Sequence, residues 1–200
     1  MPRCFSGVRV LEVGSLNIYG SVRTHFDGCE YLGVDLAEGE GVDWVCPGQL
    51  LAFPAGHFDT VVSSECFEHN PFWRETFANM LRMCRPGGLV LMTCATVGRK
   101  EHGTSRTSPH ASPFTADARW DYYRNLSERD LRSAIHLSGW MSQWRFWTNF
   151  VSHDLYFAGF RQGGDQALGD ALMHELDRRY ALTSSAKSLR RALKAQILRQ

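Results

Sequence analysis

Short runs of apolar residues recur along the first half of the chain, with polar and helix-forming segments between them. The runs are nearly continuous rather than alternating, which is typical of strands buried on both faces of a parallel sheet. We predict five such strands, at residues 8–13, 31–35, 43–45, 58–63 and 89–93.

Two helices are predicted between these strands. After Gly14 the chain is expected to pass through residues 15–20 into a helix. A clearer helix is predicted at 71–84, with Asn70 as its N-cap, Pro71 in its first turn and Pro86-Gly87-Gly88 as its stop. Its apolar face is formed by Phe77, Met80, Leu81 and Cys84.

The second half of the chain has a different pattern. Residues 98–125 are rich in Gly, Ser, Thr, Pro and His and then become aromatic; an irregular segment of this length inside a domain is usually functional or disordered. Ser127 and Asp130 indicate a capping box for a helix that ends near Gly139. Two aromatic-rich strands, at about 143–148 and 154–160, are expected to form a hairpin, and 165–200 is helix-forming.

These elements predict an α/β fold, with a seven-stranded, mostly parallel sheet, helices on both faces and an antiparallel C-terminal hairpin. The chain of 200 residues is 44% hydrophobic and 22% charged, which is a globular composition. The predicted organisation is a domain at 1–164, in which 98–125 is a loop on the substrate side, followed by a basic helical extension at 165–200.

Charge and cysteine usage narrow the function classes. The net charge of +1 argues against a protein built chiefly to bind nucleic-acid phosphates, although the basic C-terminal stretch keeps that possibility open. The 6 cysteines form no Cys-x-x-Cys pair, so we expect reduced thiols, a cytoplasmic location and no metal site. We expect no membrane span, since no apolar run approaches about 20 residues.

Candidate chemistry lies where the first two strands end. Gly14 lets a ligand approach the backbone, and the amides beyond it are donors for an anionic group. Asp35, at the end of the second strand, is placed to accept hydrogen bonds from both hydroxyls of a ribose. Each residue alone has an ordinary structural explanation, Gly14 as a turn and Asp35 as a cap.

Several motifs occur in order along the chain: 10–14 (VLEVG), 32–35 (LGVD), 58–65 (FDTVVSSE), 68–69 (EH) and 81–88 (LRMCRPGG). Together they resemble the class I S-adenosylmethionine-dependent methyltransferases, particularly the small-molecule group often called type 11. The resemblance is strong over residues 7–97 and loose over 126–160, and it implies a Rossmann-like fold for the domain at 1–164.

The resemblance implies S-adenosyl-L-methionine as the cofactor. Glu12 and Gly14 match the motif beside its methionine part, Asp35 matches the acid that holds the ribose, and Leu36 packs by the adenine. The full set of cofactor-binding residues expected from it is Glu12, Gly14, Ser15, Asn17, Asp35, Leu36, Gly48, Gln49 and Ser64.

Two departures from the family pattern stand out. Leu16 and Ile18 lie where the family has further glycines. Residues 46–49 (CPGQ) stand where many relatives have an aspartate against the adenine, so Gln49 or a backbone carbonyl would have to replace that acceptor.

The implied reaction is an in-line displacement at the sulfonium methyl, in which the protein chiefly aligns the reactants. His69 and Glu65 are the catalytic candidates, if the acceptor must lose a proton. His69 could equally serve as a partner of the helix that follows. Acceptor contacts are expected from the long loop: His102, His110, Trp120, Tyr122 and Tyr123. For these, exposure to solvent or ordinary packing is the alternative.

The functional prediction is therefore methyl transfer to a small-molecule acceptor. A non-catalytic binding or scaffold protein with the same fold is the alternative, and nucleic-acid methylation is the less favoured one. Residues 186–199 combine an apolar face with basic residues, which suggests packing on the domain, a homodimer contact or a carrier contact.

Overall fold

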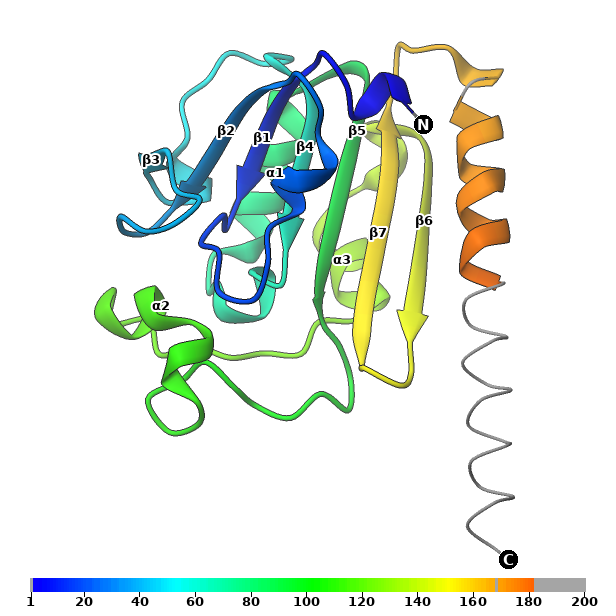
Figure 1. The fold of residues 1–200 in the computed structure, drawn as a ribbon. Helices are drawn as coiled ribbons and strands as arrows, with labels where there is room; N and C mark the ends of the chain where they lie inside the picture. Colours follow the sequence, from blue (N-terminus) through cyan, green and yellow to red (C-terminus); the bar gives the residue numbers. More distant parts are fainter. Residues whose placement is uncertain (1, 168, 182–200) are drawn as a thin grey trace, which may run out of the picture. The chain divides into compact units, whose positions relative to one another are not determined.

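The computed structural model describes residues 2–167 and 169–181, and the chain divides into two compact units, 1–164 and 165–200. In the first unit the described residues form a seven-stranded sheet in the order β3-β2-β1-β4-β5-β7-β6 (Figure 1). The strands are β1 Arg9–Val13, β2 Glu30–Asp35, β3 Trp44–Val45, β4 Phe58–Ser64, β5 Cys84–Ala95, β6 Met141–Asn149 and β7 Asp154–Arg161.

Strand directions confirm the predicted mixed sheet. Strands β1 to β5 are parallel to one another, whereas β7 runs antiparallel to β5 and β6 antiparallel to β7. All seven predicted strands are present, and the predicted hairpin is β6–β7. This is the Rossmann-like arrangement expected for the domain.

The packing of the core explains why the sequences of the central strands are continuous apolar runs. Val10, Leu11, Val61 and Val90 are completely buried, because both faces of β1, β4 and β5 are covered. Helix α1 (Trp73–Met83) lies behind the sheet in Figure 1, and its Phe77 is also fully buried. Burying each such side chain contributes about 1.5–3 kcal/mol.

The predicted helix after Gly14 is wrong. In its place the chain forms only a short 3-10 turn, Val22–His25. Side chains of the connecting loop bend the backbone: Asn17 Oδ1 accepts from the Gly20 amide at 2.9 Å, and Ser21 Oγ accepts from the Arg23 amide at 3.1 Å. Such local bonds compete with regular helix formation.

Helix α1 begins later than predicted, at Trp73, with Phe72 in the N-cap position. Asn70 is not the N-cap, because its side-chain oxygen accepts from the Phe72 amide at 2.8 Å and forms a turn before the helix. At the other end Cys84 already belongs to β5. Residues 86–88 therefore lie inside the irregular beginning of that strand, where Gly87 has a φ of +69°.

The capping box is confirmed at helix α3 (Glu128–Ala134), where Ser127 and Asp130 bond each other's backbone amides. The helix ends at Ala134 rather than near Gly139, since Ile135 is extended and a separate 3-10 turn spans Leu137–Gly139.

The segment 98–125 is ordered into a loop with two short helical pieces, Pro109–Ala111 and α2 (Pro113–Asp117). Figure 1 places α2 beyond the carboxyl ends of the parallel strands. The loop is thus held at the end of the sheet where open α/β folds bind ligands.

In the second unit, residues 166–167 and 169–181 are helical. The rest of the predicted extension, including the basic stretch 186–199, lies outside the described residues. Within the part that the structure describes, we find no helix with the length and apolar character needed to cross a membrane.

Candidate cofactor and acceptor site

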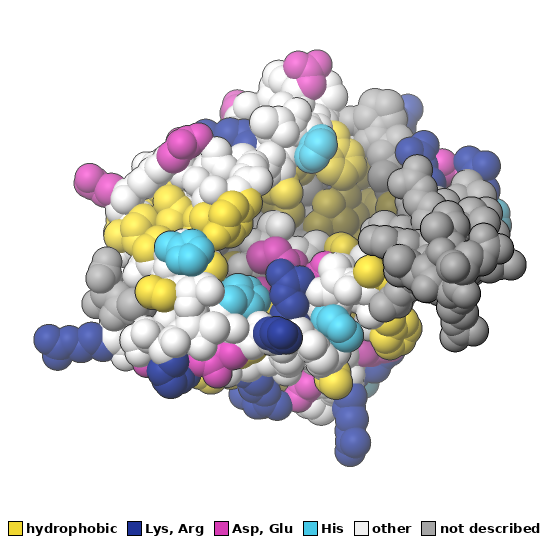
Figure 2. Space-filling model, turned by 60° about the horizontal axis from the view of Figure 1, so that its bottom comes forward, with side chains coloured by type: hydrophobic (Ala, Val, Ile, Leu, Met, Phe, Trp, Pro, Cys, Tyr) yellow, Lys and Arg dark blue, Asp and Glu magenta, His cyan; other side chains and the backbone are white. Residues whose placement is uncertain are grey.

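A cleft of about 470 Å³ lies at the carboxyl ends of β1, β2 and β4. Its volume is in the range of small-molecule and cofactor sites. Strands β2 and β3 lie on one side of β1, and β4 and the later strands lie on the other side. The strand order therefore reverses at β1, and such a reversal leaves a crevice at the carboxyl ends of the strands. Figure 2 turns this end of the molecule forward and shows acidic, basic and histidine side chains gathered beside a band of hydrophobic ones.

Gly14 makes the turn that opens the cleft after β1. Its φ is +79°, and a Cβ atom at this position would lie 2.6 Å from Cys66 Sγ, so both conformation and space require glycine. Its amide donates to the Val34 carbonyl at 2.9 Å. The turn thereby joins the ends of β1, β2 and β4.

Asp35 ends β2 at the edge of the cleft and is half-buried. One carboxylate oxygen accepts from the Leu16 amide at 3.0 Å and the other from the Leu36 amide at 2.8 Å. Burial raises the pKa of Asp35 above its ordinary value, although the two backbone hydrogen bonds act in the opposite direction. Each oxygen keeps a further lone pair, so the fixed carboxylate can still accept from hydroxyl groups.

Glu12 lines the same cleft from β1 and is only 4% exposed. The Tyr31 hydroxyl donates to its Oε2 at 2.8 Å. Burial raises the pKa of Glu12 to about 7, against the lowering effect of this hydrogen bond.

The end of the cleft beside β3 has little polar character. Cys46, Gly48 and Leu36 line it. Gln49 does not line the cleft, because Thr76 of α1 donates to its Oε1 at 3.4 Å. A substitute acceptor for an adenine ring would therefore have to come from the backbone.

The opposite end of the cleft is built by Glu65 and the 3-10 turn Phe67–His69 that follows β4. Glu65 has a left-handed φ of 51°, and its side chain accepts from Thr93 Oγ1 at 2.8 Å. Backbone strain in a residue other than glycine is often found at functional positions.

Three residues after Glu65, Glu68 is fully buried, and no hydrogen bond of good geometry reaches its carboxylate oxygens. Burial raises its pKa and the nearby Glu65 raises it further, whereas the backbone amides of Glu68 and Ala95 and the guanidinium of Arg99 lower it in part. His69 is 4% exposed; its burial, together with His102, lowers its pKa to about 4. The His69 ring is therefore neutral at physiological pH.

Residues from the long loop complete this end. The rings of His69 and His102 lie 5.0 Å apart edge to face, and Tyr123 lies 5.0 Å from His102. Gly103 makes the approach possible, since a Cβ atom there would lie 2.6 Å from Cε1 of His69.

The cleft brings together many of the residues predicted from the sequence, and their roles stay predictions. Those that line it are Glu12, Gly14, Ser15, Asp35, Leu36, Gly48, Ser64, Glu65, His69 and Trp120.

The remaining predicted residues do not line the cleft. Asn17 Nδ2 donates to Glu40 at 2.6 Å, Gln49 contacts α1, and His110 is exposed. His102 and Tyr123 stand behind His69, and the backbone of Tyr122 accepts a hydrogen bond from the His69 ring.

Sequence reasoning missed part of the lining: Cys46, Cys66, Asn70, Phe114 and Thr115. Phe114 approaches the opposite wall, where a Cβ atom at Gly39 would lie 3.1 Å from its ring and 2.5 Å from Leu16 Cδ1. The polar composition of the loop pointed to its histidines as candidate contacts. No pattern in the sequence around Phe114 predicts that it lines the cleft.

Fold and cleft together define an α/β protein with a nucleoside-sized site at the carboxyl ends of its parallel strands. The chain belongs to a methyltransferase family, since the family model described as a methyltransferase domain matches residues 2–150. No curated protein matches the chain.

Solved structures share the fold at low identity. Phosphoethanolamine N-methyltransferase 2 of Haemonchus contortus, solved with phosphomonomethylethanolamine and S-adenosylhomocysteine, is 18% identical with a TM-score of 0.55. The match covers 80% of this chain and 51% of that one, so this chain spans about half the length of the Haemonchus enzyme.

Two further neighbours differ in chemistry. The 1,6-didemethyltoxoflavin-N1-methyltransferase of Burkholderia thailandensis is 15% identical, with a TM-score of 0.54 and coverage of 78% and 72%. The [4+2]-cyclase SpnF is 13% identical, with a TM-score of 0.55 and coverage of 80% and 76%. Membership of the fold therefore does not by itself fix the reaction.

Proposed function

We propose that this chain transfers a methyl group from S-adenosyl-L-methionine to a small-molecule acceptor. The observation that carries the proposal is the Asp35 carboxylate, fixed by two backbone amides at the edge of a cleft that begins at Gly14. The solved neighbours from Haemonchus and Burkholderia hold S-adenosylhomocysteine, which supports the same cofactor here.

The residues of the cleft fit this cofactor. Asp35 would bind the ribose hydroxyls, Leu36 and Cys46 would pack against the adenine, and buried Glu12 would face the positively charged end. When bound, S-adenosylmethionine supplies a methyl group already activated by positive sulfur. The protein therefore has to align the acceptor and exclude water, which Glu65, His69 and the loop 98–125 would do.

The acceptor would lie between the turn after β4 and the long loop. His69 lines the cleft there with Trp120 and Phe114. If the acceptor must lose a proton, neutral His69 or the carboxylate of Glu65 would take it. We propose the cytoplasm as the location, since all six cysteines are free thiols.

Calorimetry with S-adenosylmethionine and S-adenosylhomocysteine tests the cofactor site. We expect micromolar binding to the unchanged chain and at least a tenfold loss in Asp35→Ala, because the ribose hydroxyls lose the carboxylate that would accept their hydrogen bonds. Glu38→Ala is the matched control: Glu38 is exposed, close to Asp35 in sequence, and does not line the cleft. Unchanged affinity in a folded Asp35→Ala protein would contradict the assignment.

A second candidate is a member of the fold that binds a ligand without transferring a methyl group. Two observations support this alternative: Gln49 lies away from the cleft, and the SpnF cyclase shares the fold. A screen of acceptors with methyl-labelled cofactor separates the two functions, since binding without any transfer favours the second. The nucleic-acid alternative depends on basic residues outside the described part of the chain.

A further inference from the structure

Three side chains at the acceptor end of the cleft form a metal-ligating group. Glu68, His69 and His102 each offer one ligand atom, and these atoms all lie within 4.8 Å of one another. Glu68 and His69 come from the turn after β4, and His102 comes from the long loop after β5. We propose that this cluster binds a divalent transition-metal ion such as Zn²⁺ or Mn²⁺.

The buried carboxylate is the first argument. Glu68 is completely buried, and no hydrogen bond of good geometry reaches either of its oxygens; the nearby backbone amides of Glu68 and Ala95 stabilise its charge only in part. Buried carboxylates in folded proteins are paired, hydrogen-bonded or bound to a metal, because an isolated buried charge strongly disfavours folding. A cation between Glu68 and the two imidazoles would give this carboxylate a direct charged partner.

The histidines are oriented as metal ligands usually are. Nδ1 of His102 lies 3.0 Å from the Lys100 carbonyl, to which it can only donate, so Nε2 is left as an acceptor. The His69 ring bonds the backbone of Tyr122, and its Nδ1 is buried without a partner. A backbone carbonyl on one ring nitrogen fixes the tautomer that presents the other nitrogen to a metal.

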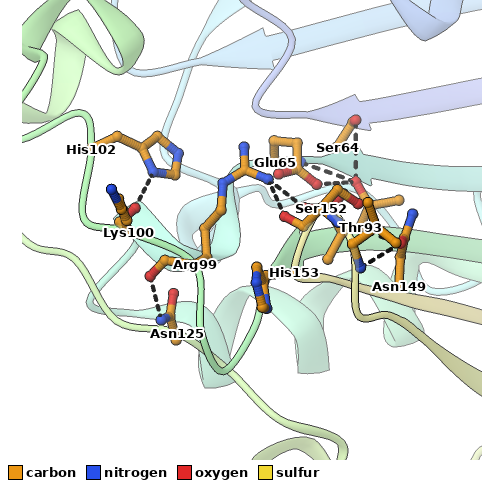
Figure 3. A network of polar contacts seen from close by, with 12 residues as sticks. Ser64, Glu65, Thr93, Arg99, Lys100, His102, Asn125, Asn149, Ser152 and His153 are labelled. Carbon is orange, nitrogen blue, oxygen red and sulfur yellow. Dashed lines mark hydrogen bonds and ion pairs between the residues drawn. The ribbon is translucent and has the colours of Figure 1, made fainter. Parts of the chain in front are cut away.

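The local charge balance favours a divalent cation. The ionisable groups around Glu65 and Glu68 include a third carboxylate, Asp154, and one guanidinium, Arg99. Arg99 is already engaged, since its Nη1 donates to the Ser152 carbonyl (Figure 3) and to Asp154, each at 2.7 Å. A divalent cation would supply the positive charge that this group of carboxyl side chains lacks, since the Arg99 guanidinium is already paired.

The ligand types select the class of metal. Two imidazoles and a carboxylate suit Zn²⁺, Mn²⁺ and related ions, whereas Mg²⁺ and Ca²⁺ prefer sites made of oxygen ligands. Tetrahedral Zn²⁺, with donors at about 2.1 Å, brings its ligand atoms to roughly 3.4 Å from one another. The three donors lie within 4.8 Å of one another, so on binding they would draw together by at most about 1.4 Å.

The position of the cluster indicates what the ion would do. His69 lines the cleft together with Glu65, so coordination positions not filled by protein would face the acceptor. This step rests on the proposed function: in a methyltransferase, such an ion would hold and orient the acceptor through an oxygen atom.

Titration with Co²⁺ tests the site directly. Tag-free, full-length protein is stripped with a chelator and titrated while visible absorption is recorded. We expect one equivalent to bind, with affinity lowered about 100-fold or more in Glu68→Gln and His102→Ala. His110→Ala is the matched control, since His110 is an exposed histidine of the same loop; it should bind like the unchanged chain.

Thermal unfolding gives a second readout. Zn²⁺ should raise the Tm of the unchanged chain and of His110→Ala, but not that of Glu68→Gln, which should be the more stable protein without metal. No saturable binding, equal affinity in all variants, or a thiolate-to-cobalt charge-transfer band would overturn the proposal.

Calorimetry with S-adenosylmethionine on the same samples keeps the two proposals separate. Cofactor binding without metal binding overturns only the metal site. Metal binding without cofactor binding overturns only the proposed methyl transfer.

Discussion

At the scale of single residues, the buried carboxyl group of Glu12 makes the stability of the folded protein depend on pH. Its pKa is raised from 4.5 to about 7, mainly by burial. Between these values the folded protein binds more protons than the unfolded chain, so stability falls as pH rises through this window, by about 3 kcal/mol in total. The groups that act on Glu12 are Tyr31, Arg23, Asp35 and Asp43.

Glu12→Gln should remove this dependence, because a neutral amide carries no buried charge at high pH. We expect the variant to gain little stability at pH 5 and up to about 3 kcal/mol at pH 8, relative to the unchanged chain. Urea unfolding at both pH values measures this difference, with Glu38→Gln as the exposed control. An equal effect at pH 5 and pH 8 would show that Glu12 does not titrate in this window.

Residue-level predictions from sequence succeeded where the position followed directly from a strand. Asp35 and Glu65 come immediately after or at the end of buried strands, so their arrival at one edge of the sheet could be predicted. The approach of His102 to His69 could not. It depends on the left-handed Gly103 and on the path of a long loop, neither of which leaves a periodic signal in the sequence.

At the scale of elements, the segment 98–125 encloses the cleft through Phe114 of α2, which lies against Gly39 and Leu16. Phe114→Ala should therefore loosen the enclosure without disturbing the sheet. We expect the bound cofactor to dissociate about tenfold faster, as the loss of one aromatic contact of about 1–1.5 kcal/mol implies.

Stopped-flow fluorescence of the tryptophans, which include Trp120 in the cleft, measures this rate. Phe150→Ala is the control, because Phe150 is 78% exposed and does not line the cleft. Equal dissociation rates for the Phe114→Ala protein and the unchanged chain would mean that α2 does not hold the ligand in place.

Elements with regular patterns and the capping box of α3 were predicted well, whereas the segment after Gly14 and the start of α1 were not. The strands could be predicted because burial on both faces is visible as continuous apolar runs. The helix expected after Gly14 is replaced by a 3-10 turn, because Asn17 and Ser21 bond nearby amides. Helix α1 starts at Trp73 because the Asn70 side chain forms a turn before it.

At the scale of the whole molecule, the strand order determines where chemistry can occur. Segments far apart in the sequence, after β1, β2, β4 and β5, all reach one end of the sheet. This convergence explains how the family match extends over residues 2–150 while identity to the solved neighbours stays at 13–18%. The strands must be apolar because the sheet is buried. Only a few residues, at the ends of the strands, have to match the ligand.

The most direct test of the central claim is a crystal structure of the full chain with S-adenosylhomocysteine. We expect the adenosine in the cleft, with both ribose hydroxyls within about 2.6–3.2 Å of the Asp35 carboxylate. The sulfur should point toward Glu65 and His69. A nucleoside bound elsewhere, or a cleft in which Leu16 and Phe114 close over the Asp35 carboxylate and exclude the ligand, would contradict the account.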